Sequence, residues 1–108
     1  RDRVIAVLDM GYTLLEECGF TRAEAVRATG QLVMRNIENV LEAGCDGALT
    51  GPIERNDIET VKKHIACMQN DDSDDVSLYK MLGTKLANIA EKKNPDKDYT
   101  QMMELLRG

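Results

Sequence analysis

The chain has 108 residues, the size of one ordinary domain with a single hydrophobic core. Hydrophobic residues make up 43% of it and charged residues 31%, so we expect a folded chain rather than a disordered one. The net charge is −5 and the basic residues are scattered among acidic ones. Because phosphate binding requires clustered lysine and arginine, these features argue against a nucleic-acid partner.

The sequence also argues against a membrane protein and a secreted one. No apolar run reaches the length of a membrane-spanning helix, and the first residues do not resemble a secretory signal. The chain has three cysteines, an odd number that cannot all pair within it, and none of them has CxxC spacing. We therefore expect reduced thiols in a cytoplasmic protein. The chain begins at Arg1 with an amphipathic stretch, and we therefore expect it to be a piece of a longer protein.

The spacing of apolar residues predicts an all-α domain of about five helices. Gly19 is expected to end the first helix, and the sequence Thr21-x-x-Glu24 is a capping box that begins a long second helix. Gly44 is expected to end that helix, Asp57 to cap the third, and Asn94-Pro95 to stop the fourth. The expected helices span about residues 4–18, 22–43, 58–68, 75–93 and 99–106, with an acidic connection over 70–75. Apolar stripes are expected at Val26, Gly30, Val33, Ile37 and Val40 on the second helix, at Ile58, Val61, Ile65 and Met68 on the third, and at Leu78, Leu82, Leu86 and Ile89 on the fourth.

The first segment allows a second interpretation, as a buried strand that ends in Asp9-x-Gly11-x-Thr13. Such an end is similar to the phosphate-handling loop of haloacid-dehalogenase-type phosphatases. Those loops carry a second aspartate two residues after the first, where this chain has Gly11. A phosphatase also needs further strands, and none is evident downstream. The helical interpretation is therefore favoured.

The residues that could carry chemistry are few. His64 is the only histidine and no cysteine completes a ligand set with it, so no metal site is predicted. His64 and Cys67 are three residues apart on a helix, so they form either a nucleophilic pair or, the favoured alternative, a surface imidazole beside a half-buried thiol. The chain has no GxGxxG turn and no P-loop, and we do not expect it to bind a dinucleotide tightly by itself.

The segment between Gly44 and Asp57 is expected to be a loop. In it Thr50 offers a hydroxyl, Gly51 permits close backbone approach, and Arg55 offers a forked cation for a carboxylate or phosphate. The helix that follows favours anions at its N-terminus. From spacing alone, the simpler interpretation is a rigid connector with Arg55 exposed.

The loop and its flanks resemble the signature of a reductase family. The matching pattern is ALTGPIxRxDxxTVxxH over residues 48–64, with ENV at 38–40 and LYxxLG at 78–83. Members of that family join an N-terminal Rossmann-like domain to a helical C-terminal domain of unknown function. This sequence departs from the pattern at Asn56, where the family usually has glycine, and at Asp2, near an expected asparagine.

The resemblance implies that residues 1–108 form one helical domain, similar to the C-terminal domains of 6-phosphogluconate dehydrogenase and pyrroline-5-carboxylate reductase. In such enzymes this half forms the homodimer and closes one wall of the substrate cleft, while NADP or NAD binds the Rossmann domain, which this chain lacks. Some relatives look like ketopantoate reductases, which implies a small 2-oxo acid as substrate. The resemblance further implies that Thr50, Gly51 and Arg55 line the cleft, with Asn39 and His64 as candidates for substrate contact or proton donation.

A different class of function is also open, a free-standing helical interaction module without catalysis. A strand and a glycine-rich turn encoded before Arg1 would favour the reductase. A homodimer is predicted in either case. Leu32, Met34 and Leu41 lie beyond the main stripe of the second helix, and a domain of this size has too little core to bury them all.

Overall fold

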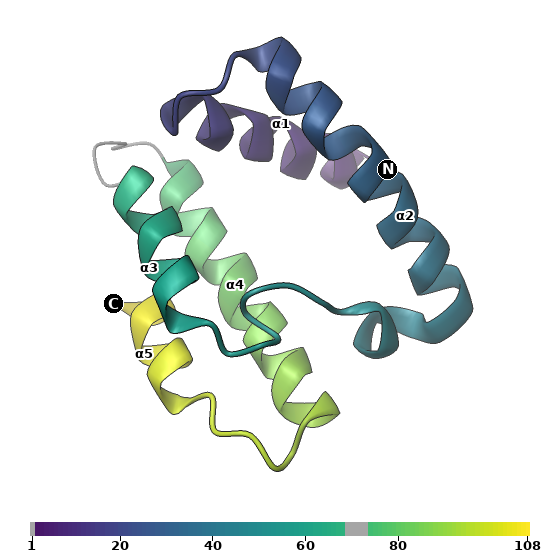
Figure 1. Ribbon diagram of the computed structural model, residues 1–108, viewed down its shortest axis with the longest axis vertical. Coiled ribbons are helices and arrows are strands. Elements are labelled where there is room, and N and C mark those ends of the chain that lie inside the picture. Colours follow the sequence, from purple (N-terminus) through teal and green to yellow (C-terminus); the bar gives the residue numbers. More distant parts are fainter. Residues whose placement is uncertain (1, 69–73) are drawn as a thin grey trace.

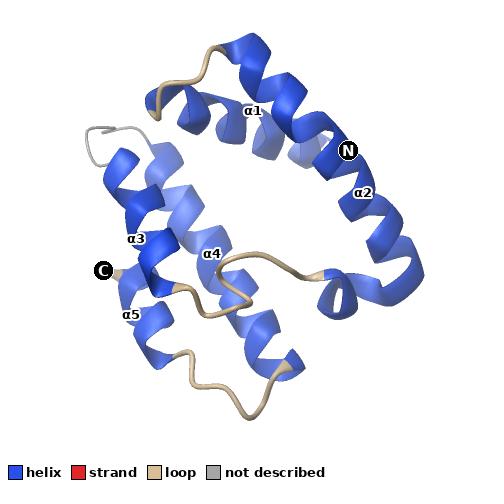
Figure 2. Ribbon diagram, viewed as in Figure 1, coloured by secondary structure: helices blue, strands red, loops and turns tan. Residues whose placement is uncertain are grey.

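The computed structural model describes residues 2–68 and 74–108. Within these residues it contains five helices and no strand, which confirms the predicted all-α class (Figure 1, Figure 2). In chain order the helices are α1 (Asp2–Glu17), α2 (Arg22–Ala48), α3 (Ile58–Cys67), α4 (Asp74–Lys93) and α5 (Thr100–Arg107). The predicted connection over residues 70–75 lies mostly outside the described residues.

Helices α1 and α2 form a hairpin (Figure 1). Gly19 closes α1 with a φ of 103°, and its N–H donates to the carbonyl of Glu16 over 3.0 Å. The predicted capping box begins α2: the N–H of Glu24 donates to the Thr21 hydroxyl over 3.1 Å, and the N–H of Thr21 donates to the Glu24 carboxylate over 2.9 Å. Both bonds satisfy N–H groups that a helix start leaves free, so the turn between the helices is well defined.

Helix α2 is one turn longer than the sequence predicts. Gly44 breaks the regular helix as expected, with a φ of 75° and a ψ of 176°. The chain then makes a further turn to Ala48, where the N–H of Leu49 donates to the carbonyl of Cys45 over 3.1 Å. The regular helix thus ends at Gly44 as predicted, and what the sequence did not predict is the separate turn after the kink, which a single glycine in an unusual conformation does not prevent. The loop between α2 and α3 therefore begins at Leu49.

Helix α3 begins where Asp57 caps it, as predicted. The N–H of Thr60 donates to the Asp57 carboxylate over 3.2 Å, and the Thr60 hydroxyl donates to the other carboxylate oxygen over 2.7 Å. The bond from the hydroxyl, and then that from the N–H, hold the pKa of Asp57 below its usual range. Val61 and Met68 are buried, and Ile58 and Ile65 are half-buried and pack against the core, which confirms all four inward positions.

The predicted apolar stripe of α4 is wrong in part. Leu78 and Leu86 are exposed, whereas the buried residues of α4 are Gly83, Ala87 and Ala90. The cause is the close approach of α5. A Cβ atom at Gly83 would lie 2.8 Å from a methyl carbon of Leu106. Small residues on α4 therefore let Leu106 and its neighbours pack directly against the helix backbone.

The hydrophobic core consists of two clusters. The larger unites the loop, α3, α4 and α5 around Val61, Tyr99, Met102 and Leu106. The smaller packs α1 against Met68 at the end of α3 and against side chains of α4. The Cα radius of gyration is 14.0 Å, compared with about 13 Å expected for a compact domain of this length. The difference fits Figure 1, in which α1 and α2 form an arm beside the unit made by α3, α4 and α5.

Helix α2 buries little of its apolar surface within the chain. Of its residues, all of which the structure describes, only Ala25 is buried. Three members of the predicted stripe are exposed by 40% or more, namely Val26, Ile37 and Val40. The stripe exists, but it does not pack into this chain's own core.

Candidate functional site

The loop between α2 and α3 is held on the C-terminal end of α4. The ammonium group of Lys93 donates to the carbonyl of Leu49 over 2.7 Å and lies 3.4 Å from the Glu54 carboxylate. The amide of Asn94 donates to the same carboxylate over 3.2 Å, and the Tyr99 hydroxyl donates to the Glu54 carbonyl. These contacts join residues some forty positions apart, and they make the loop a rigid part of the domain.

Glu54 takes part in most of the contacts that hold the loop. The hydrogen bond from Asn94, and with a smaller effect the contact with Lys93, hold the pKa of Glu54 below its usual range. The carboxylate therefore stays ionised and paired inside the loop. The sequence interpretation missed this network because nothing in the local pattern of Asn94 or Tyr99 indicates a partner so far away in the chain.

Asn56 adopts the left-handed backbone conformation, with a φ of 61°. Glycine adopts this region at no cost, and asparagine is among the few other residues that tolerate it. This explains how Asn56 can replace the glycine that the family pattern predicts. The side-chain amide of Asn56 also donates to the carbonyl of Asp98 over 2.7 Å, which ties the loop to the segment before α5.

Two substitutions of Asn56 should separate two contributions to the free energy of unfolding: the tolerance of asparagine for a positive φ and its side-chain hydrogen bond to Asp98. Asn56→Ala should lower the free energy of unfolding by about 1–3 kcal/mol, because alanine is strained at positive φ and also loses the bond to Asp98. Asn56→Gly loses only the bond and should lower it by about 1 kcal/mol or less. Urea unfolding of both variants measures the difference. A glycine variant less stable than the alanine variant would contradict this account of the turn.

A groove lies between α2, the start of the loop and α4. Its volume is about 490 Å³. Leu32, Asn36 and Val40 line it from α2, and Leu86 and Ile89 line it from α4. The loop adds Leu49, Thr50, Gly51 and Pro52. The groove is therefore mainly apolar, with a few polar groups that could orient a ligand, an arrangement typical of small-molecule sites.

Two of the predicted site residues meet at this groove, Thr50 and Gly51. Gly51 has a φ of 111°, which a side chain would strain, and a Cβ atom built there would have no neighbour within 4 Å. The glycine is thus required by the backbone and leaves open space beside Thr50. Their assignment to substrate binding stays a prediction.

The other predicted residues lie elsewhere. Arg55 is exposed and does not line the groove, and its guanidinium makes no hydrogen bond or ion pair with any residue that the structure describes. Asn39 is exposed on α2, whereas Asn36 lines the groove. The spacing of Leu32, Asn36 and Val40 puts them on one helix face, so the sequence did carry a signal for Asn36. His64 lines a separate apolar cavity of about 260 Å³ beside α1.

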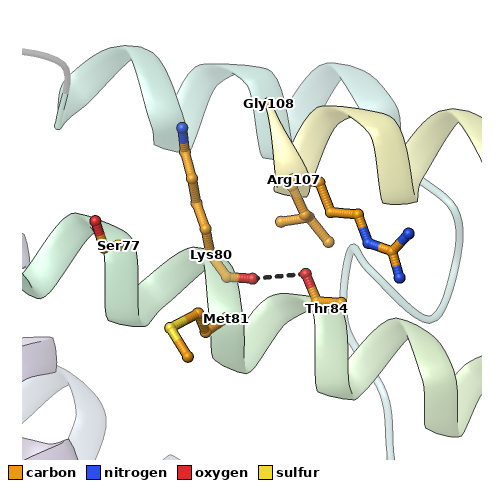
Figure 3. A pocket seen from close by; sticks show the side chains of 7 residues that line it. Ser77, Lys80, Met81, Thr84, Arg107 and Gly108 are labelled. Atoms are coloured by element: carbon orange, nitrogen blue, oxygen red, sulfur yellow. Dashed lines mark hydrogen bonds between the residues drawn. The ribbon is translucent and has the colours of Figure 1, made fainter.

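A further hollow lies between α4 and the end of α5. Two cationic side chains line it, but their charged groups do not converge. It has a volume of about 570 Å³ and is lined by Lys80 and Arg107, among others. Figure 3 shows the two charged groups pointing away from one another, and the hydroxyl of Thr84 donating to the Lys80 carbonyl, a bond of 2.9 Å. Because the cations diverge, this hollow is a weaker candidate for an anion site than the groove.

The described residues contain no group of three or more histidine, cysteine, aspartate or glutamate side chains placed to hold a metal ion. No helix among them has both the length and the apolar character needed to cross a membrane.

The described residues thus form a helical domain with a firmly held loop, a mainly apolar groove and an apolar helix face that the chain itself does not bury. Residues 2–86 match the family described as a domain of unknown function (DUF2520), and the chain belongs to that family. The match spans α1 to α3 and most of α4, and so includes the whole groove loop. This confirms the helical domain of unknown function that the resemblance indicated. Neither a curated protein nor a solved structure matches the chain.

Proposed function

We propose that this domain is the dimerisation and substrate-cleft half of an NAD(P)-dependent oxidoreductase that acts on a small 2-oxo acid such as ketopantoate. The observation that carries the proposal is the exposed apolar face of α2. Leu41 is 82% exposed, Met34 61% and Ile37 51%, and their spacing of three and four residues puts them on one face. A surface of this kind indicates a protein partner.

A second copy of the chain is the partner that fits best. Symmetric dimers bring the same patch of two subunits together, and a long straight helix face is complementary to itself across a two-fold axis. The same helix also presents Leu32, Asn36 and Val40 to the groove. One helix would then serve both the interface and one wall of the cleft, so that dimerisation fixes the shape of the cleft.

The groove suits a small substrate with one anionic end. Its walls are mainly apolar and Thr50 offers a hydroxyl, while Arg55 lies further along the same loop, outside the groove lining, where its charge also acts on the Asp57 carboxylate. A carboxylate is the natural partner of a guanidinium, which can donate two parallel hydrogen bonds to it. Asn39 and His64, the candidates for substrate contact or proton donation, do not line the groove, and we assign them no role in it.

We propose that the dinucleotide is held outside the described residues. They contain no strand and no glycine-rich turn that leads from a strand into a helix, which is how pyrophosphate is usually held. NADP or NAD would therefore bind to a separate Rossmann domain, and we assign no step of hydride transfer to residues of this chain. The alternative function, a helical interaction module without catalysis, draws support from the same face of α2.

A matched pair of charge changes on α2 tests the interface. Ile37→Glu should weaken a dimer by about a hundredfold or more, because a carboxylate without a partner in an apolar interface costs several kcal/mol and the symmetry introduces it twice. Arg35→Glu also adds a glutamate, but two residues away and therefore on another face. Sedimentation velocity over a concentration series measures both. Equal weakening by the two variants, or no effect of Ile37→Glu, would contradict an interface at this face.

A further inference from the structure

Two cysteines from distant parts of the sequence lie near one another, and one of them, Cys18, lines the small cavity that His64 also lines. Cys18 follows the last residue of α1, and Cys67 is the last residue of α3. Both are free, and the side chain of Cys67 lies close enough to that of Cys18 to raise its pKa. Cys18 packs in the same cluster as Met68, the chain neighbour of Cys67, so the backbone brings the two cysteines to the same place, as the ~2.05 Å bond of a disulfide requires.

The backbone holds both cysteines in place. The N–H of Cys18 donates to the carbonyls of Leu14 and Leu15 over 3.2 and 3.0 Å. Met68, which follows Cys67, is 3% exposed and packs in the same cluster as Leu14 and Cys18. A bond between the two sulfur atoms would therefore join segments that already pack together, with little loss of freedom.

The two thiols differ in access. Cys67 is exposed, whereas Cys18 is half-buried. Burial raises the pKa of Cys18 to about 11, and the hydrogen bond with Cys67, the charge of Cys67 and that of Glu17 add to the effect. Since the thiolate is the reactive form, Cys18 reacts slowly with an oxidant from solution at neutral pH. Cys67 is the thiol that meets such an oxidant first.

We propose that Cys18 and Cys67 are a peroxide-sensitive pair that closes to an intramolecular disulfide. The Cys67 sulfur gives up its proton and attacks one oxygen of hydrogen peroxide. The O–O bond breaks, a sulfenic acid forms on Cys67, and the departing hydroxide takes up the proton to leave as water. The Cys18 sulfur then attacks the sulfenic sulfur and loses its own proton, and the displaced hydroxide leaves as a second water. Two thiols lose two electrons in all, and one peroxide is reduced to two waters.

The bond ties the α1–α2 hairpin to the unit formed by α3, α4 and α5. The groove has α2 as one wall and α4 as the other. A link from the end of α1 to the end of α3 therefore limits how far these walls can separate. This consequence holds whether the groove belongs to a reductase or to an interaction module.

The test uses the 108-residue chain with Cys45→Ser, which removes the exposed thiol on α2. After treatment with hydrogen peroxide, both remaining thiols should be lost to a thiol reagent. Peptide mapping without reductant should recover Cys18 and Cys67 in one linked pair. The melting temperature should rise by roughly 10 °C or more and return after reduction, because the bond closes a long loop. With Cys18→Ser added, the sulfenic acid on Cys67 should persist and be trapped by dimedone.

Three outcomes would overturn the proposal. In the first, both thiols still react after peroxide treatment. In the second, they are lost as sulfinic or sulfonic acids without a linked peptide. In the third, the linked peptides join two chains rather than one. Peptide mapping of the Cys45→Ser chain, which keeps both Cys18 and Cys67, distinguishes these outcomes even if the variant with Cys18→Ser does not fold.

Discussion

Replacing Leu106 with alanine should lower the free energy of unfolding by about 2–5 kcal/mol. Leu106 is 1% exposed and lies over Gly83, in the cluster that unites α3, α4 and α5. Alanine loses the buried methyl groups and leaves a cavity that the backbone of α4 cannot fill, because Gly83 has no side chain to move into it. Urea unfolding followed by circular dichroism measures the loss.

The matched control is Leu105→Ala, the same substitution one residue earlier. Leu105 is only half-buried at the edge of the cluster, so its loss should be clearly smaller. Equal losses for the two variants would show that α5 does not pack on Gly83 as described.

In the complete reductase that we propose, Arg55→Ala should raise the KM for the 2-oxo acid about ten- to a hundredfold and change kcat little. A hydrogen-bonded ion pair between a guanidinium and a carboxylate contributes roughly 1.5–3 kcal/mol. A contact made equally in the ground state and the transition state affects KM rather than kcat. Arg55 is exposed and its guanidinium bonds to no described residue, so folding and NADPH affinity should stay nearly unchanged.

Lys85→Ala is the control for this substitution, since it removes an exposed cation from α4 at a position that does not line the groove. It should leave KM unchanged. If Arg55→Ala leaves kcat/KM unchanged but lowers the melting temperature, Arg55 is structural. The simpler interpretation of the loop as a rigid connector would then be correct.

Local signals in the sequence predicted most of the helices. The capping box at Thr21 and Glu24, the cap at Asp57 and the stop at Gly19 all act within one helical turn, so the residues that cause them are neighbours in the chain. Such features can be read without knowing the fold. The conformation of Asn56 is also a local feature: the family usually has glycine at this position, and Asn56 has the positive φ that glycine favours.

Packing was harder to predict, because it depends on what covers each helix. The spacing on α4 favoured leucine as the buried residue, but the approach of Leu106 to Gly83 requires small residues there. On α2 the apolar stripe was found correctly, yet within one chain it faces outward. Periodicity identifies an apolar face and says nothing of whether the same chain or another one covers it.

Only part of the candidate site could be predicted, because some of its residues are neighbours in the chain and others are not. Thr50 and Gly51 meet at the groove because they are adjacent in the loop. The residues that hold this loop, Lys93, Asn94 and Tyr99, come from some forty positions further along the chain, and no local pattern marks them. Contacts over such distances follow from the fold, and only the structure reveals them.

We propose that the exposed face of α2 joins two copies of this chain. Light scattering coupled to size exclusion tests it most directly, with the unmodified chain loaded over a series of micromolar concentrations. If the two copies join there, we expect a molar mass near twice 12.1 kDa, about 24 kDa, that falls only on strong dilution. A mass of 12.1 kDa at every concentration would contradict it.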